Sequence, residues 1–573
     1  MITDPKDFPK SDYVDVMLFS EGTYPYVKGG VSSWIYQLMT GLPHVTFGVC
    51  FVGASEIVDG KKLQVSYPFP DNLIHVETHY LFDNEADFKP KRRDGSKEGF
   101  EAVEELYSAF KSENFSLPKM LEDLDFYSEV VSFEDFLYSK RSWEFINKVY
   151  MKNCPDVPFV DYFWTLRNIH KPIWVLASIV KGLPKTGIYH APSTGYAGFL
   201  GSLASFSTNK PFVLTEHGIY TRERKIDMLS ADWIEYKKPE LLQQPEEYNY
   251  IKKMWIDFFE KIGVFCYNRS NMILSLFNGA RKIQIAYGAN ENKCFVIPNG
   301  VDVDGLKATM KNRDPQPKPI VTLIGRVVPI KDIKTFIRAI KIALQDNPDI
   351  EGWIVGPIDE DLEYFDECQQ MSVSLGLKKE KQEFDGNHSK LSQAELIEHE
   401  DKIKFFGFSN IKEILPKSAL QTLSSISEGM PLVILEGFAA GVPCVATDVG
   451  SCRDLIEGGI DGDDMKIGQA GAITGIANPG ALAKEYVRLL DFENGTWEAA
   501  QKAGLTRVET YYRQESFLQD YDDIYQEALL GSWDDYMKKV FPYYAPNKIP
   551  YAKEFKRMFP IKKFTCKLDK GVN

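Results

Sequence analysis

The sequence predicts an α/β protein with two doubly wound parallel-sheet domains that face each other across a cleft, and with a helical insertion in the first domain. Three observations predict this class. Short apolar runs alternate with helix-spaced patterns in both halves, and polar loops follow the apolar runs. A turn-rich and proline-rich segment at 300–318 separates the halves. The chain of 573 residues is too long for one ordinary core.

The first half opens with a strand-like run that ends in Ser-Glu-Gly, followed by a glycine pair and a helical pattern, which is one half of a βαβ unit. Long helical patterns interrupt the strands over about 84–180, and we expect a helical insertion there. The expected strands are 12–22, 46–54, 187–192, 211–218, 272–277 and 294–302.

The second half repeats the alternation, beginning with a strand at 319–325 and an amphipathic helix. Its further expected strands are 351–359, 402–408, 419–427 and 443–450. The predicted domains are 1–305, an N-terminal domain with the insertion; 306–515, a C-terminal doubly wound domain; and 516–573, a terminal helix and basic tail.

Bulk properties exclude several classes of protein. A net charge of −14 argues against general nucleic-acid binding. The start of the chain lacks a signal peptide's apolar core, no apolar run reaches membrane-spanning length, and the eight cysteines are scattered, so we expect a cytoplasmic protein with reduced thiols. No GxGxxG follows either first strand, which lowers the expectation of a dinucleotide-dependent dehydrogenase.

The loop GRVVPIK follows a strand and carries Arg326 and Lys331. A guanidinium fork and an ammonium point charge can neutralise a diphosphate without a metal. On spacing alone, two surface cations on a solvated loop remain the alternative.

The stretch SISEGMPLVILE holds two carboxylates, Glu428 and Glu436, around a predicted strand-to-helix turn. Gly429 permits close approach of a ligand, and Pro431 suits the first turn of a helix whose free N–H groups attract phosphate. The two glutamates could then reach different parts of one extended ligand. A helix cap and an exposed helix carboxylate are equally compatible with the spacing.

These residues also carry a resemblance. E-x7-E after a strand, with VIPNGVD, GR-x4-K, WIVGP, IKFFGF and GVPCVAT, resembles the retaining nucleotide-sugar glycosyltransferases of family 4 over most of 290–460. FSEGTYPYVKGGVSSWI, YHAPSTGYAG and LTEHGIYTRER look like the cytosolic transferases of Pel-type exopolysaccharide systems. One departure is Asp332, where the family usually has glycine; aspartate is itself a good helix cap.

The resemblance implies a GT-B fold of two Rossmann-like domains, with 1–305 as the acceptor-side domain, 306–515 as the nucleotide-sugar-binding domain and a helix after 515 that crosses back onto the first domain. It also implies a role for each matching residue. Arg326 and Lys331 match the pair on the donor diphosphate, Glu436 the carboxylate on the ribose hydroxyls, and Glu428 the one beside the donor sugar. His217 matches an N-domain histidine near that sugar. Further donor-site matches are Gly29, Gly30, Gly325, Phe408, Ser425, Gly429, Met430 and Pro431, the last without an N–H to give.

The implied reaction is retaining transfer from a UDP-hexose, with UDP-glucose the expected donor, to a polysaccharide or sugar acceptor, with no metal or other cofactor. Alternatives are a transferase for UDP-N-acetylhexosamine, a nucleotide-sugar epimerase or phosphorylase, and a UDP-sugar-binding scaffold or regulatory subunit of a membrane synthase complex. The segment 553–570 carries seven basic and two acidic residues. It is either a docked terminal helix or a contact with an anionic membrane or membrane-bound synthase subunits.

Three other signals carry less weight. His75 and His79 lie in a strand-like stretch where a spacing of four does not build a helical metal pair. The D-x-D at 302–304 and the acidic run 461–464 are interpreted as solvated turns. His190 ends a strand that faces the cleft, and a core histidine with satisfied hydrogen bonds is about as compatible with the pattern.

Overall fold

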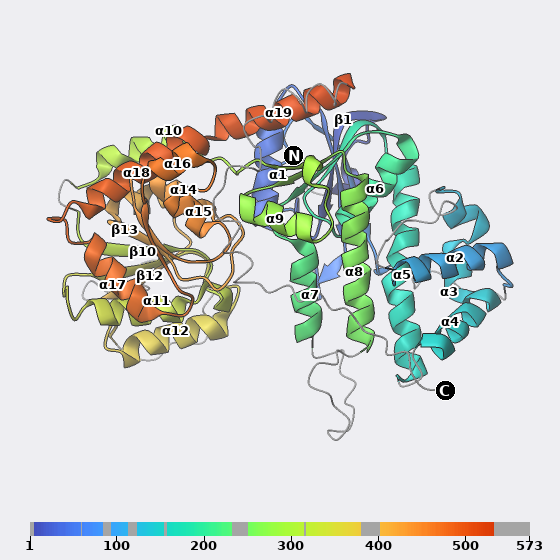
Figure 1. Ribbon diagram of the computed structural model, residues 1–573, viewed down its shortest axis with the longest axis horizontal. Coiled ribbons are helices and arrows are strands. Elements are labelled where there is room, and N and C mark those ends of the chain that lie inside the picture. Colours follow the sequence, from blue (N-terminus) through green and yellow to red (C-terminus); the bar gives the residue numbers. More distant parts are fainter. Residues whose placement is uncertain are drawn as a thin grey trace, which may run out of the picture.

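The computed structural model describes residues 5–58, 60–83, 93–112, 123–153, 157–231, 250–314, 317–379 and 401–531. It contains two large sheets, each wrapped by helices and lying side by side (Figure 1), and every strand pair within them is parallel. The predicted fold class is confirmed. The predicted basic tail lies outside the described residues.

The first sheet has the order β5-β2-β1-β6-β7-β8-β9. Alternate residues of β1 enter two different cores: Met17 and Phe19 pack on one face of the sheet, and Val16 and Leu18 on the other. This is why the strands read as continuous apolar runs. The strands are β1 (Tyr13–Glu21), β2 (Phe47–Gly53), β5 (Leu73–Tyr80), β6 (Lys185–Ala191), β7 (Phe212–Glu216), β8 (Met272–Ser275) and β9 (Cys294–Val296).

Helices cover both faces of this sheet, and the insertion lies on the side away from the second sheet (Figure 1). The helices of the first half that bear on the site are α1 (Gly30–Gly41), α6 (Tyr196–Thr208), α7 (Tyr220–Ser230) and α8 (Tyr250–Arg269). The insertion comprises α2 (Lys97–Ala109), α3 (Phe133–Tyr138), α4 (Lys140–Asn153) and α5 (Phe159–Gly182). In the part of the chain that is described, no helix combines the length and apolarity needed to cross a bilayer.

The second sheet has the order β12-β11-β10-β13-β14-β15, so the strand order reverses between β10 and β13. Its strands are β10 (Ile320–Ile324), β11 (Glu351–Val355), β12 (Ile403–Gly407), β13 (Leu420–Leu423), β14 (Cys444–Thr447) and β15 (Gly471–Thr474). Its main helices are α11 (Ile333–Ala343), α12 (Leu362–Ser374), α14 (Leu432–Ala439), α17 (Pro479–Leu489) and α18 (Thr496–Tyr511). The short strand β15 was not among the strands predicted from the sequence.

Helix α19 (Gln514–Leu530) runs from the second half onto the first sheet (Figure 1). There the Tyr525 hydroxyl lies 2.7 Å from His190 Nδ1, and the other ring nitrogen lies 2.8 Å from the hydroxyl of Thr215. Tyr521 also reaches Thr215, at 3.2 Å. His190 is thus a buried histidine whose two ring nitrogens both have hydrogen-bond partners. Of the two predicted alternatives, the core histidine is the correct one, and His190 does not face the cleft.

The acidic run at 461–464 corrects one expectation. Asp461 caps the short helix α16 (Gly462–Lys466), as a turn residue would. Asp464, however, is fully buried, and its carboxylate accepts a bond of 2.6 Å from Arg507 Nε. The solvated-turn interpretation is therefore wrong for Asp464, because a buried carboxylate needs a cation that lies far away in the sequence.

Candidate active site

Lys331 and Glu428 meet where the strand order of the second sheet reverses. The loop after β10 carries Lys331 and the loop after β13 carries Glu428, and the Lys331 Nζ lies 2.5 Å from Glu428 Oε1. Both side chains are largely buried, at 17% and 11% exposure. Ligands of doubly wound sheets bind at this switch point, outside the carboxyl ends of the strands. The structure brings together two predicted residues that lie 97 positions apart.

The two loops are tied to each other by further bonds. The Ile426 N–H donates to the carbonyl of Ile330 at 2.9 Å, and the Ser424 hydroxyl donates to the carbonyl of Lys331 at 2.9 Å. The buried Ser425 hydroxyl donates to Glu428 Oε1 at 2.5 Å. Ser425 therefore holds the Glu428 carboxylate in place, and its own hydroxyl faces protein.

Arg326 lies on the same loop but outside this pair. Its side chain is 53% exposed and forms an ion pair of 2.5 Å with Glu360, which follows β11. The loop starts at Gly325, whose carbonyl would lie 2.0 Å from a Cβ placed on Gly356. Only glycine fits at 356, so the Arg326 loop and the loop after β11 pack backbone to backbone.

Asp332 takes the left-handed conformation with φ 46°, and its side chain accepts from the Thr335 N–H at 3.3 Å as the cap of α11. A glycine would enter this conformation without a Cβ penalty, and aspartate tolerates it while adding a cap. The departure from the family pattern at this position is thus compatible with the same loop.

The turn before α14 presents backbone rather than side chains. Pro431 is the N-cap of α14 and the helix itself begins at Leu432, one residue later than expected. The Met430 side chain is buried in the core of the second half, so only its main chain can face a ligand. Glu436 lies within α14, and burial raises the pKa of its carboxyl to about 7.

The first half approaches this turn at His217. A Cβ placed on Gly429 would lie 2.8 Å from the backbone oxygen of His217, so the two halves touch here and glycine permits it. The His217 ring packs edge-on against Trp34, and burial lowers the pKa of the imidazole to about 3. Its Nε2 has no hydrogen-bond partner among the described residues.

The remaining predicted donor-site residues are exposed. Gly29 is the N-cap of α1 and Gly30 its first residue, and a Cβ on either would meet nothing within 4 Å. Phe408 follows β12 and is 84% exposed, an unusual position for a phenylalanine. All three are accessible to a ligand.

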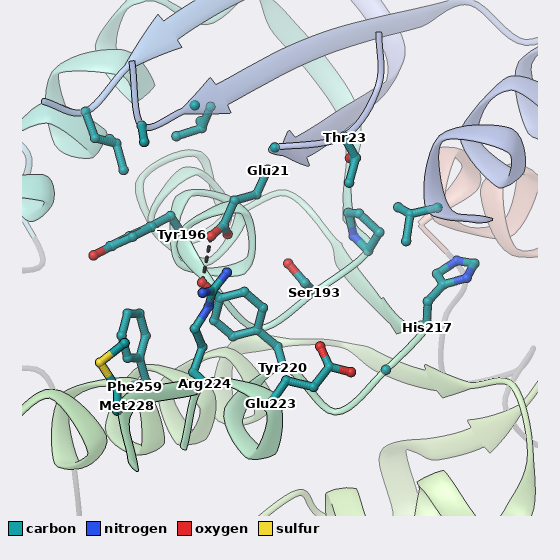
Figure 2. Close-up of a pocket in the computed structure, with 18 of the residues that line it drawn as sticks. Glu21, Thr23, Ser193, Tyr196, His217, Tyr220, Glu223, Arg224, Met228 and Phe259 are labelled. Carbon is teal, nitrogen blue, oxygen red and sulfur yellow. Dashed lines mark hydrogen bonds between the residues drawn. The ribbon is translucent and has the colours of Figure 1, made fainter. Parts of the chain in front are cut away.

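A cavity of about 580 Å³ lies at the carboxyl ends of the first sheet's strands and was not predicted. Figure 2 shows Glu21 entering it from β1, opposite Tyr220, Glu223 and Arg224 on α7. The Tyr220 hydroxyl donates to Glu21 Oε1 at 2.7 Å. FSEG places Glu21 at the end of a strand, and GIYTRER follows the next-but-one strand of the sheet directly, which is the signal that could have identified these residues.

The histidines of β5 form a hydrogen-bonded chain. His75 Nε2 lies 3.1 Å and His79 Nε2 2.9 Å from the two carboxylate oxygens of Glu77, which lowers the pKa of that carboxyl to about 2. Cys50, Glu77 and His79 each bring one potential ligand atom within 4.8 Å of the others. Both Glu77 oxygens already accept from imidazoles, so the geometry is that of a satisfied network.

Asp302 caps α10 (Val303–Lys307), as a turn residue would.

Two protein families match the chain. Residues 307–491 match glycosyl transferases group 1, and residues 14–292 match a domain of unknown function, DUF3492. The second domain thus matches glycosyl transferases group 1 over residues 307–491, and the chain is a glycosyltransferase with the GT-B fold.

Among curated proteins, the chain is 26% identical over 360 residues to an Escherichia coli enzyme, UDP-Gal:α-D-GlcNAc-diphosphoundecaprenol α-1,3-galactosyltransferase. That match covers 58% of this chain and 79% of the relative. It is 32% identical over 131 residues to the N-acetyl-α-D-glucosaminyl L-malate synthase of Bacillus anthracis, covering 23% of this chain and 32% of the relative.

Two solved structures share the architecture. HepE of Anabaena, crystallised with UDP, aligns with a TM-score of 0.51 and 14% identity, covering 89% of this chain and 99% of its own. Sucrose-phosphate synthase of Thermosynechococcus elongatus aligns with a TM-score of 0.50 and 13% identity, covering 90% and 99%. At these identities the likeness establishes the fold alone.

Proposed function

We propose that the chain is a retaining transferase that takes a UDP-hexose, with UDP-glucose the expected donor, and extends a Pel-type extracellular polysaccharide from the cytoplasmic side. The observation that carries this proposal is the Lys331–Glu428 pair at the switch point of the second sheet. The E. coli relative, which is named for a UDP-Gal donor, supports a UDP-linked sugar. The resemblance to PelF-like transferases supports the polysaccharide role.

The pair suits a site in which opposite charges develop. As the bond between the anomeric carbon and the diphosphate breaks, negative charge gathers on the leaving group and positive charge on the sugar ring. The Lys331 ammonium has three N–H donors, so it can bond Glu428 and a phosphate oxygen together. Glu428 then stabilises the cationic sugar, while Lys331 reduces the repulsion between the Glu428 carboxylate and the diphosphate.

The acceptor oxygen forms the new bond to the anomeric carbon on the face that the diphosphate leaves. Its proton passes to the departing phosphate oxygen, so that no separate general base and no metal are required. Arg326 and the N–H groups at the start of α14 add to the stabilisation of the leaving diphosphate. Arg326 is exposed, so it can exchange Glu360 for a phosphate.

Glu436 is proposed to accept hydrogen bonds from the ribose hydroxyls, which makes donor binding pH-dependent. Its pKa is about 7 without a ligand, and hydroxyl donors favour the ionised form. Donor binding should therefore release a proton, and UDP-glucose affinity should rise about tenfold from pH 6 to pH 8. Calorimetry in buffers of different ionisation enthalpy measures both effects. Glu436→Gln should abolish the pH dependence; a slope that persists in this variant would assign it to another group.

The proposed function is tested with a panel of UDP- and GDP-sugars, measuring binding by calorimetry and turnover as nucleotide release with and without an acceptor. UDP-glucose should bind and turn over, and the product should keep the donor's α configuration. Binding without turnover would favour the scaffold alternative. Preference for UDP-N-acetylhexosamine would correct the donor sugar and leave the assignment as a transferase unchanged. Isomerisation of the donor would identify an epimerase.

A further inference from the structure

The cavity in the first half is a separate compartment from the Lys331–Glu428 pair. Its walls come from the carboxyl ends of β1, β2, β6 and β7 and from α7 and α8, all within the DUF3492 region. At His217 and Gly218 the wall reaches the point where Gly429 touches the first half. A molecule in the cavity would thus extend to the turn that carries Glu428. Its volume of about 580 Å³ is that of a typical ligand pocket.

Two carboxylates, Glu21 and Glu223, are among the polar groups that line the cavity. Glu21 is held by the Tyr220 hydroxyl at 2.7 Å and by the Ala197 N–H at 3.1 Å. The Glu223 carboxylate lies over Gly218, where it would collide with a Cβ, and it makes no hydrogen bond among the described residues. Figure 2 shows it on the α7 side of the cavity. It is therefore available to a ligand.

Arg224 is the one cation in the cavity wall as the described residues define it, and it already has partners. Its guanidinium lies 3.2 Å from Asp227 and 5.0 Å from the centre of the Tyr220 ring. A phosphate in this cavity would face two carboxyl groups, Glu21 and Glu223, against one guanidinium that already interacts with Glu21, Tyr220 and Asp227. The charge distribution thus disfavours an anionic ligand.

The rest of the wall suits a sugar ring. Tyr220 and Trp255 both pack against Phe259, with ring centres 6.0 and 5.9 Å apart, and present an aromatic surface. A pyranose has C–H groups to pack on these rings and hydroxyls that can donate to carboxylates.

We propose that this cavity is the acceptor site, that it takes the end of a phosphate-free saccharide, and that Glu223 determines this specificity by accepting hydrogen bonds from its hydroxyls. The assignment rests on the proposed transferase function and adds to it the cavity that holds the acceptor, the absence of a phosphate on the acceptor and a specificity-determining residue. The hydroxyl to be glycosylated lies at the His217 end, next to Gly429 and the donor sugar.

The experiment uses the full chain with UDP-glucose and two matched acceptor sets. One set holds neutral glucose and N-acetylhexosamine oligosaccharides of two to four rings, and the other holds the same sugars as farnesyl diphosphate conjugates. Transfer is followed by mass spectrometry, and UDP-glucose binding and hydrolysis are measured separately. The variants are Glu223→Ala and Arg224→Ala, with Glu101→Gln on the insertion helix α2 as the control.

The neutral saccharides should be glycosylated. Glu223→Ala should raise the KM for the acceptor about tenfold or more, since it removes hydrogen bonds to a charged group, and UDP-glucose affinity should stay within twofold. Transfer to the conjugates alone, with Arg224→Ala the damaging variant, would overturn the inference. Transfer to neither set, with UDP-glucose still bound and hydrolysed, would overturn the acceptor site alone. Failure of the unmodified chain to bind UDP-glucose would instead contradict the proposed function.

Discussion

Replacing Lys331 by methionine should lower kcat/KM for glycosyl transfer by about 10³-fold, as expected when a fixed donor to a developing negative charge is lost. The effect should be large because Lys331 serves two partners at once. Without it, the diphosphate loses a cation and Glu428, 2.5 Å away, becomes an uncompensated carboxylate beside it. Lys331→Arg should recover part of the activity, because the planar guanidinium of arginine keeps the positive charge but places its donors differently from the lysine ammonium.

Lys341→Met is the matched control, since Lys341 lies exposed in the last turn of the neighbouring helix α11. It should keep normal kinetics. Thermal unfolding of each variant separates a folding defect from a catalytic one, because Lys331→Met also leaves a largely buried carboxylate without its cation. Near-normal kcat/KM in a folded Lys331→Met protein would remove Lys331 from the chemistry.

Glu428→Gln should lower kcat by about 10²-fold or more, while UDP binds at least as tightly as before. The amide keeps the shape and can still accept from Ser425, but it carries no charge to stabilise a cationic sugar. Ser425→Ala should give a smaller loss, because it frees the carboxylate to move without removing it. Glu413→Gln, on the exposed side of α13 (Ile411–Ile414), should behave as the unmodified protein. Equal losses of kcat and of UDP affinity in Glu428→Gln would mean that Glu428 holds the nucleotide.

Much of this architecture could be predicted because the strands of a doubly wound sheet are buried on both faces. Such strands appear as continuous apolar runs, and the loops after them carry the polar residues of the site. The proximity of Lys331 and Glu428 follows from that rule, since β10 and β13 are neighbours. The strand β15 was missed because its residues, GAIT, include only one large apolar side chain and so do not form an apolar run.

The remainder depended on packing between distant segments. Nothing near Asp464 in the sequence indicates that Arg507 will bury its carboxylate. Glu21 and Arg224 line the same cavity because β1 and α7 lie close together in the fold. Residue spacing in the sequence does not reveal that proximity. Likewise, the bond from Ser425 to Glu428, which makes Ser425 a positioning residue, required the conformation of the turn.

Glu428 and Glu436 are proposed to contact two different parts of one nucleotide sugar, the donor sugar and the ribose. Calorimetry of UDP and of UDP-glucose, with the unmodified chain, Glu428→Gln and Glu436→Gln, tests this proposal most directly. Glu436→Gln should weaken both ligands by the same factor, about tenfold, as expected for loss of hydrogen bonds to a charged group. Glu428→Gln should spare UDP and remove the difference in affinity between the two ligands. If both variants weakened UDP alike, both carboxylates would contact the nucleotide, and the proposed role of Glu428 at the donor sugar would be wrong.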